Sequence, residues 1–297
     1  MFHSWLMRAK SPPSSVPHGT PVQGGALEVV VADLHINSTV ALCPLRVRRD
    51  AGGTYYRSEQ QDWLAEKWTE LWDQVEAEKK ASGLPLYVVY LGDVCDKNQH
   101  SRTELIEYES NVVILQMCVE VLERPLNLAD RTFVVRGTEA HTGSSGYIEE
   151  HLARQVGAEP DPDGGGRVSW WHLCQEVAGI KTDLCHHAQT YARRPWTAGA
   201  GAARQAAITC DEYDDLGEGR PQLVGRAHGH YAAMGYKSKT FCFYCPPWQL
   251  STPFARRLGA GRRVEPPGAW MFWLTGQVPV RWRLIDFPVP RGAIWRP

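Results

Sequence analysis

The first half of the chain alternates between continuous apolar runs and amphipathic segments. Residues 27–32 and 86–91 are almost entirely hydrophobic, which is typical of strands buried on both faces of a sheet. Residues 59–80 instead repeat apolar side chains every three or four positions, on a face formed by Leu64, Trp68, Leu71, Trp72 and Val75. This periodicity predicts a helix between the two strands, and Gly83 with Pro85 predicts where that helix ends.

The pattern changes after a second helix and a third strand. We expect that helix over residues 102–123, stopped by Pro125, and that strand over 132–136. Farther along the chain, the pattern predicts a hairpin over 168–187 that turns at Ala178-Gly179, a helix over 199–215, and mainly strands over 222–287. The sequence therefore predicts an α/β fold built on a two-sheet β-sandwich flanked by helices.

The ends of the chain differ from its middle. Residues 1–25 have a short apolar patch and then Pro, Ser and Gly, without the apolar core and cleavage site of a signal peptide. We interpret them as a flexible N-terminal arm, residues 26–290 as a single domain, and 291–297 as a tail. No internal repeat or linker divides the long middle segment.

Composition excludes few classes of protein. Among 297 residues, 43% are hydrophobic and 22% are charged, as in an ordinary soluble globular protein. The formal net charge of −1 gives no overall attraction to nucleic acid or to a membrane surface. No apolar run reaches the roughly 18 residues needed to span a bilayer.

The eight cysteines are irregularly spaced and do not form a disulfide framework. We expect Cys95, Cys118, Cys174 and Cys185 to be small buried side chains. A CxxC pair at 242–245 has no second pair to complete a zinc ribbon, so we interpret it as part of a strand. This use of cysteine suits a reducing cytoplasm.

Side chains able to bind metal ions follow five segments that have the pattern of buried strands. They are Asp33 with His35, Asp93, Glu139 with His141, the pair His186-His187, and His228 with His230. Strand ends that meet at one edge of a sheet build ligand sites in α/β folds. Five such segments in a chain with only 11 histidines predict a two-metal hydrolytic centre.

The spacing within these segments bears on their geometry. Asp33 and His35 are two residues apart, so on an extended backbone both side chains point to one face. Asp93 follows a glycine and could bridge two metal ions with its two oxygens. Adjacent His186 and His187 point to opposite sides, so we expect one ligand from the pair. Each residue taken alone has an ordinary alternative, such as Asp96 capping the loop after the second strand.

The order of these motifs resembles that of the calcineurin-like metallophosphoesterase superfamily. The resemblance covers roughly residues 27–256 and is closest to phosphoesterases of phages and prophages, through GTEAH, CHHA, RAHGHY and PPWQLSTPFA. It implies a four-layer αββα fold and hydrolysis of a phosphomonoester or phosphodiester. In that family, a hydroxide that bridges two metal ions attacks the phosphorus atom.

The resemblance also implies a role for each residue. The first metal ion would be held by Asp33, His35, bridging Asp93 and His230; the second by Asp93, Glu139, His228 and one of the paired histidines. We prefer His187, which leaves His186, Lys97 and Arg136 to contact the substrate, and His141 to act as the general acid. The third motif departs from the family because Thr138 and Glu139 stand where Asn and His are usual, so Thr138 is an alternative for the Asn position.

Oxygen and imidazole ligands without thiolate suit Mn²⁺ first, with Fe, Zn²⁺ or Ni²⁺ as alternatives. The expected partner is a phosphate ester, which includes a nucleotide or nucleic acid; no membrane partner is expected, and the oligomeric state stays open. A second class of function is a phage-encoded binding or scaffold protein that keeps the fold with little catalysis. A third class, a zinc hydrolase of other esters or amides, lacks its commonest HExxH motif here.

Overall fold

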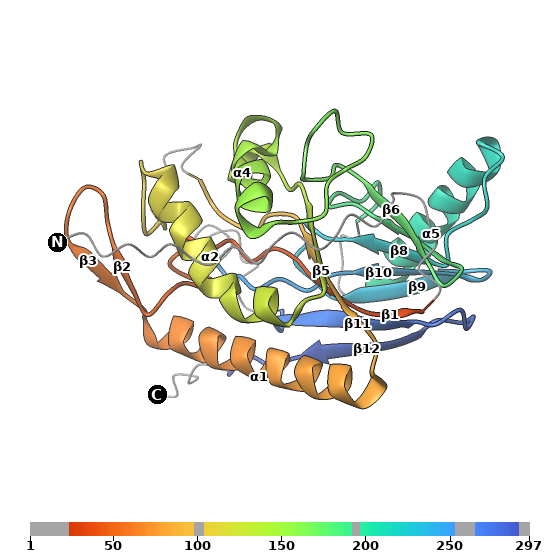
Figure 1. The fold of residues 1–297 in the computed structure, drawn as a ribbon, viewed down its shortest axis with the longest axis horizontal. Helices are drawn as coiled ribbons and strands as arrows, with labels where there is room; N and C mark the ends of the chain where they lie inside the picture. Colours follow the sequence, from red (N-terminus) through yellow and green to blue (C-terminus); the bar gives the residue numbers. More distant parts are fainter. Residues whose placement is uncertain (1–23, 98–103, 192–196, 253–264, 291–297) are drawn as a thin grey trace, which may run out of the picture.

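The computed structural model describes residues 24–97, 104–191, 197–252 and 265–290. The N-terminal arm and the C-terminal tail that the sequence predicts lie outside these residues, apart from 24 and 25. Two five-stranded sheets and a small two-stranded sheet account for the strands of the described chain (Figure 1).

The first sheet has the strand order β12-β11-β1-β4-β5. Its strands are β1 (Ala26–Val31), β4 (Leu86–Leu91), β5 (Arg131–Val135), β11 (Gly268–Leu274) and β12 (Arg281–Asp286). Strand β4 runs parallel to both β1 and β5, whereas β11 is antiparallel to its two neighbours. The carboxyl ends of β1, β4 and β5 therefore meet at one edge.

The second sheet has the strand order β6-β7-β8-β10-β9. Its strands are β6 (Leu173–Val177), β7 (Ile180–Leu184), β8 (Leu223–Arg226), β9 (Ala233–Lys237) and β10 (Thr240–Tyr244). The hairpin predicted over 168–187 is present as β6 and β7, which turn at Ala178 and Gly179. Strands β7, β8 and β10 run parallel, so their carboxyl ends also share an edge.

Three hydrophobic cores join four layers, and they confirm the predicted two-sheet fold flanked by helices. Along β1, Val29 and Val31 face a core shared with the helices α1, α2 and α4, while Val30 faces the second sheet. A smaller core packs α5 on the outer side of the second sheet. Alternate side chains along β1 thus serve two cores, which is why the run is apolar at nearly every position.

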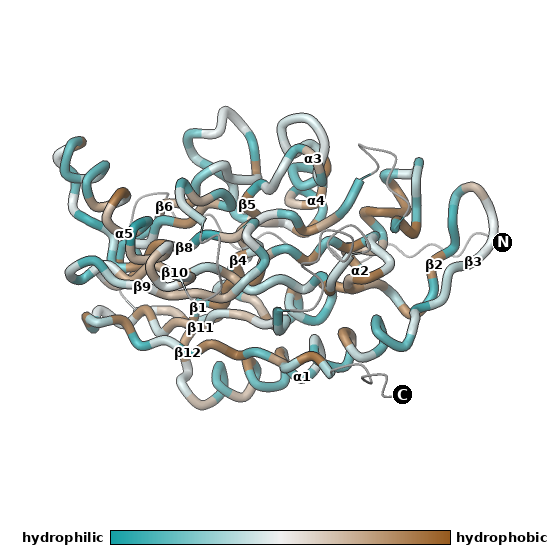
Figure 2. Tube along the Cα trace, turned by 180° about the vertical axis from the view of Figure 1, so that it is seen from behind, coloured by the Kyte–Doolittle hydropathy of each residue, from teal (hydrophilic) through white to brown (hydrophobic). Residues whose placement is uncertain are grey.

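Helix α1 (Glu59–Ser82) matches its prediction. Ser58 and Gln61 form a capping box at its start, and Gly83 ends it with a φ of 67°. Figure 2 shows hydrophilic and hydrophobic residues mixed along α1, as expected for an amphipathic helix that covers a sheet.

Helix α2 (Asn111–Leu128) begins later than predicted and continues through Pro125, where the sequence predicted its end. A proline inside a helix leaves the carbonyl four residues earlier without its usual donor. Here that carbonyl, of Val121, accepts a hydrogen bond of 3.1 Å from the Trp68 indole. A contact with another helix thus offsets the cost of Pro125.

The remaining elements are short, apart from α5. They are β2 (Arg46–Arg48), β3 (Thr54–Tyr56), α3 (Glu139–Thr142), the 3-10 turn η1 (Ser144–Gly146), α4 (Tyr147–Val156) and α5 (Ala198–Asp215). Among the described residues, no helix is long and apolar enough to cross a membrane.

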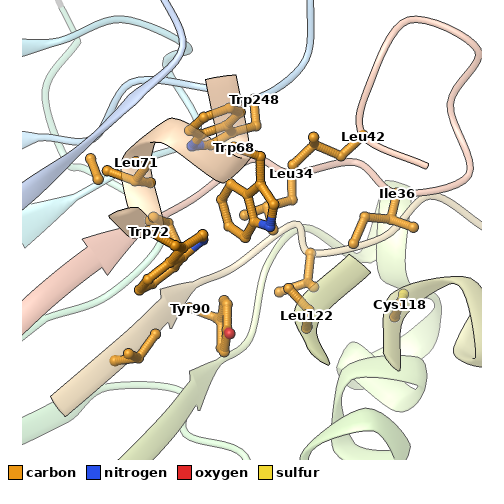
Figure 3. Packing of buried hydrophobic residues seen from close by; sticks show 14 of the residues in the cluster. Leu34, Ile36, Leu42, Trp68, Leu71, Trp72, Tyr90, Cys118, Leu122 and Trp248 are labelled. Carbon is orange, nitrogen blue, oxygen red and sulfur yellow. The ribbon is translucent and has the colours of Figure 1, made fainter. Parts of the chain in front are cut away.

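The expectation of buried cysteines was wrong at two positions. Cys174 is exposed, because it lies on the outer face of edge strand β6, and Cys185 is only partly buried. Cys242 and Cys245 are both buried, but only Cys242 belongs to strand β10, since Cys245 follows its last residue. Trp248 is fully buried and packs with a ring-centroid distance of 4.8 Å against Trp68 (Figure 3).

Glu28 on β1 places a carboxyl group in the core between the sheets. It is fully buried, it accepts a hydrogen bond from Gln175 on β6, and its second oxygen, Oε1, has no hydrogen-bond partner. Burial raises the pKa of Glu28 to about 7. Because the folded chain then binds a proton more tightly than the unfolded chain, stability falls as pH rises from about 4.5 to above 7.

We therefore expect Glu28→Gln to stabilise the protein at pH 8, where the carboxylate is charged, and to have little effect at pH 5. The gain at pH 8 should approach about 3 kcal/mol, since one pKa unit is worth about 1.4 kcal/mol. Denaturant unfolding of both proteins at the two pH values measures the difference. An equal effect of the substitution at both values would contradict a buried group that titrates near neutrality.

Candidate metal centre

The carboxyl ends of five strands bring the predicted ligands together. Three strands of the first sheet supply Asp33, Asp93 and the 138–141 segment, and two strands of the second sheet supply the four histidines from His186 to His230. Close approach of these segments depends on glycine: a Cβ at Gly92 would overlap the His186 ring, and one at Gly137 would overlap Asp93. The site therefore lies where the two sheets meet at one edge.

One group of possible ligands consists of Asp33, His35 and His230. Asp33 Oδ1 is 3.8 Å from His35 Nε2 and 3.4 Å from His230 Nε2. That oxygen is fully buried and has no hydrogen-bond partner. Since a buried carboxylate oxygen without a partner is costly, its position among imidazole nitrogens fits a metal ion.

Asp93 lies between this group and a second one. Its Oδ1 accepts a hydrogen bond of 2.6 Å from the backbone N–H of Thr138. Its Oδ2 faces His186 Nε2 at 3.0 Å and His228 Nδ1 at 3.9 Å. Oδ2 is thus the oxygen directed at these histidines, while Oδ1 is bound to the backbone; the sequence suggested that both oxygens could bridge two metal ions.

The second group contains His186, His187 and His228. His186 is buried, and its Nδ1 donates to the Leu91 carbonyl at 2.7 Å, which leaves Nε2 to face Asp93. A backbone carbonyl that fixes the far nitrogen is the usual arrangement for a metal-binding imidazole. His187 is exposed instead, with its Nε2 3.2 Å from Thr138 Oγ1. The sequence suggested that His186 contacts the substrate, but its side chain is buried against Asp93.

The third motif places Thr138, rather than Glu139, beside the histidines. Thr138 Oγ1 is 3.0 Å from His228 Nδ1. The Glu139 side chain is exposed, and its Oε1 accepts a hydrogen bond of 2.9 Å from the backbone N–H of Ser145. Glu139 does not belong to any group of possible metal ligands among the described residues.

Asp96 is a member of the site that the sequence suggested only as a loop cap. Its Oδ1 accepts hydrogen bonds from Nδ1 of His35 at 3.0 Å and Nδ1 of His141 at 2.5 Å. The carboxylate is buried, so both imidazoles are held with their Nε2 atoms toward the centre, and His141 Nε2 lies 4.0 Å from Asp93 Oδ2. The sequence did contain a signal for Asp96, because the GDxxD motif places it only three residues after Asp93.

The two other residues predicted to contact substrate, Arg136 and Lys97, lie in different surroundings. The Arg136 guanidinium is buried, binds Ser169, the Ser145 carbonyl and Glu150, and stacks on Trp171. These contacts use Arg136 to support η1 and the start of α4. Lys97 is half-buried, and its backbone N–H donates to the His141 carbonyl at 2.7 Å, which places Lys97 beside the site.

The backbone at the ligand positions is unusual. Positive φ values of 45–62° occur at Asp33, His35, Asp93, His228 and His230. Such values are uncommon for residues other than glycine and cluster at functional sites. The sequence argument assumed an extended backbone for the Asp33–His35 and His228–His230 pairs; left-handed turns after the strands bring these side chains to the centre instead.

The carboxylates set the charge state of the histidines. Burial opposes protonation of His35 and His186, but Asp96 raises the pKa of His35 to about 10 and Asp93 raises that of His186 to about 9. Burial likewise opposes ionisation of Asp33 and Asp93, yet the neighbouring histidines hold both pKa values below the usual range. The carboxylates thus require positive charge here, which divalent ions would supply while the imidazoles stay neutral.

Glu149 supports the centre from beneath and was not found from the sequence, because no motif contains it. It is fully buried on α4, and it accepts hydrogen bonds from the backbone N–H groups of Val94 at 3.0 Å and Gly137 at 2.6 Å. Burial, with Asp93 nearby, raises the pKa of Glu149 to about 7. One side chain thereby ties together the loops after β4 and β5.

Comparisons with known proteins find similarity only among solved structures. No protein-family model matches the chain, and no curated protein matches it. Vacuolar Protein Sorting 29 from Cryptosporidium parvum is 14% identical, with a TM-score of 0.42 over 89% of this chain and 100% of that one. A novel archaeal phosphodiesterase is 9% identical, with a TM-score of 0.40 over 88% and 99%.

A predicted phosphoesterase from Streptococcus pneumoniae is also 9% identical, with a TM-score of 0.34 over 89% of this chain and 99% of that one. At these identities and TM-scores, the similarity assigns neither a family nor an activity to the chain. The resemblance to phage enzymes stays a prediction.

The close approach at Gly137 generates a test of the centre. Gly137→Ala should push Asp93 out of place, and we expect at least a tenfold loss of Mn²⁺ affinity, since Asp93 touches both groups. Gly219→Ala is the matched control, because a Cβ there meets nothing within 4 Å. Isothermal titration with Mn²⁺ measures both variants. Unchanged affinity in Gly137→Ala would show that Asp93 does not bind the ions.

Proposed function

We propose that the chain is a metal-dependent phosphoesterase with a two-metal centre. The observation that carries the proposal is the position of Asp93, whose Oδ2 lies between the Asp33–His35–His230 group and the histidines at 186 and 228. Two groups of oxygen and imidazole ligands that share one carboxylate suit a pair of hard or borderline divalent ions, with Mn²⁺ as our first choice.

The donor set proposed for each ion follows from these contacts. Asp33, His35 and His230 would hold the first ion, and His186 and His228 the second, with Asp93 shared. We now prefer His186 to His187, because its Nδ1 is fixed by the Leu91 carbonyl and its Nε2 faces Asp93. When bound, the two ions would neutralise phosphoryl oxygens and lower the pKa of a water molecule that attacks phosphorus.

His141 is the proposed general acid. Asp96 accepts a hydrogen bond from Nδ1–H of His141, so that the cationic form of this imidazole holds its second proton on Nε2, for transfer to the departing oxygen. Because Asp96 also orients His35, one carboxylate keeps the acid and a metal-binding imidazole in fixed relation. Lys97, beside His141, is a candidate for contact with a phosphoryl oxygen.

The substrate is proposed only as a phosphate ester, monoester or diester. A screen of aryl phosphomonoesters and phosphodiesters with Mn²⁺, Ni²⁺, Mg²⁺ and Zn²⁺ tests this directly. Turnover of at least one substrate class, abolished by chelation and by Asp93→Asn, is the expected result. Two bound ions without turnover of any substrate would favour the alternative of a binding or scaffold protein.

Substitutions of the proposed metal ligands and of the proposed acid should have different effects on metal content and on turnover. His141→Ala should keep both ions and lose about 10²–10⁴ in turnover of substrates with poor leaving groups, because only these need a proton delivered. Asp93→Asn should lose metal as well, because a neutral amide is a poor ligand for two cations. Elemental analysis and rates on alkyl and activated aryl phosphates give the two readouts.

His151→Ala is the control for this pair, since His151 is exposed on α4 and packs on Tyr147. Loss of metal in His141→Ala would assign His141 as a ligand and leave the acid to another residue. An equal loss of rate on both kinds of substrate would also argue against proton transfer from His141.

The third motif provides a second pair of variants. Thr138→Ala removes a hydroxyl that lies 3.0 Å from His228, so we expect weaker binding of the second ion, by up to about tenfold. Glu139→Ala removes only a carboxylate bound to the Ser145 N–H, so both ions should stay. Mn²⁺ titration of both variants decides which residue matters. Depletion of an ion in Glu139→Ala alone would restore Glu139 as the ligand.

A further inference from the structure

A second cluster of metal-binding side chains lies on the outer face of the β6–β7 hairpin. His172, Cys174 and Asp183 each offer a ligand atom, and these atoms lie within 4.8 Å of one another. None of the three belongs to the ligand groups around Asp93, which are built from residues after the strand ends.

The hairpin register explains why these side chains meet. Cys174 on β6 pairs directly with Asp183 on β7, so the two side chains stand side by side on one face. His172 is two residues before Cys174, and Cys185 is two residues after Asp183, just beyond the last pair, Leu173 and Leu184. The period of two along a strand directs all four polar side chains outward, away from the core between the sheets.

Asp183 lies beside His172 and is held by two cationic neighbours. Its Oδ1 is buried and within ion-pair distance of His172 Nε2, at 2.9 Å, and of the Arg226 guanidinium, at 2.7 Å, although neither contact has hydrogen-bond geometry. Its Oδ2 accepts a hydrogen bond of 3.0 Å from the Tyr213 hydroxyl on α5. The carboxylate is therefore held in place from one side, with one oxygen directed at His172.

The other two donors are reachable from solvent. The His172 side chain is 48% exposed, and Cys174 is exposed with its Sγ 3.3 Å from the Tyr213 hydroxyl. An ion can therefore enter from outside without opening the fold. Tyr213 contacts both Cys174 and Asp183, which supports two of the donors from one side chain of α5.

We propose that His172, Cys174 and Asp183 form a separate site for one zinc ion. A set of one imidazole, one thiolate and one carboxylate matches the ligands of zinc, and thiolate disfavours the harder Mn²⁺ and Mg²⁺. Cys185 or a water molecule completes the four positions. The thiol releases its proton on binding, so the charges of the thiolate and the carboxylate balance that of the ion.

Arg226 is compatible with an ion at this place. Its guanidinium also donates to the carbonyls of Asp183 at 3.0 Å and Gly225 at 2.8 Å, so it stays fixed beside the carboxylate. Ligating carboxylates usually keep such hydrogen-bonding partners. The ion would join β6, at the edge of the sheet, to β7 and stiffen that edge.

Co²⁺ distinguishes this site from the centre at Asp93. A thiolate bound to Co²⁺ absorbs strongly in the near ultraviolet, and the ligand groups at Asp93 contain no cysteine. Titration of the reduced, metal-free protein with Co²⁺ should develop this absorption within three equivalents, because the centre at Asp93 can take two further ions. The absorption should be absent in Cys174→Ser, or halved there if Cys185 is also a ligand, and His172→Gln should weaken binding at least tenfold. Asp93→Asn should keep it, which separates this site from the proposed catalytic centre.

Cys210→Ser is the control, since Cys210 is a buried thiol of α5 that bonds Thr240. Loss of intensity in Cys185→Ser would identify a second thiolate, and full intensity there would assign water. Zinc-edge X-ray absorption of the zinc-loaded wild type adds a test without mutation, with a sulfur neighbour expected at about 2.3 Å. No thiolate absorption in the wild type, or the same absorption in Cys174→Ser, would overturn the proposal.

Discussion

The burial of three carboxylates at one edge of the sandwich is the constraint on which the rest of the site depends. Asp33, Asp93 and Asp96 are each essentially inaccessible to solvent. Burying unpaired charges is expensive, so positive charge must accompany them. Without metal, protonated imidazoles of His35 and His186 provide it, since the carboxylates raise both pKa values; in the proposed two-metal centre, the ions would provide it and the imidazoles would be neutral ligands. The three buried carboxylates thus require compensating positive charge, and the groups around them are arranged to supply it.

The topology of the two sheets explains how three carboxylates come to lie so close. Parallel strands β1, β4 and β5 end at one edge, and β7 and β8 of the facing sheet end beside them. The chain then turns through positive φ values at ligand positions rather than at glycines alone. Such strain persists only where surrounding structure enforces it. Here Gly92 and Gly137 allow the close approach, and Glu149 holds both loops.

Elements could be predicted where the pattern of apolar residues reflects burial in the core. They could not be predicted where a contact with a residue distant in sequence determines the structure. The apolar run of β4 and the face of α1 could be predicted because core packing selects them directly. The extension of α2 past Pro125 could not, because it depends on an indole from α1. The gathering of Asp33, His35, Asp93, His228 and His230 at one place could be predicted from strand ends, but the preference for His186 as a proposed ligand needed the Leu91 carbonyl. The role of Glu149 has no local signal, since it acts through backbone atoms of two other segments.

The same contacts explain how the third motif can vary without loss of the centre. The residue at 138 supports Asp93 through its backbone N–H, which any residue except proline provides. The side chain there contributes only an oxygen near His228, a role that a hydroxyl can fill in place of an amide. Glu139 lies outside the groups of possible metal ligands among the described residues, and its carboxylate instead accepts a hydrogen bond from Ser145 of η1. His141, two residues later, is positioned by Asp96 and not by its distance from residue 137. The position of His141, the proposed acid, therefore depends on a carboxylate of the second motif and not on the length of the third.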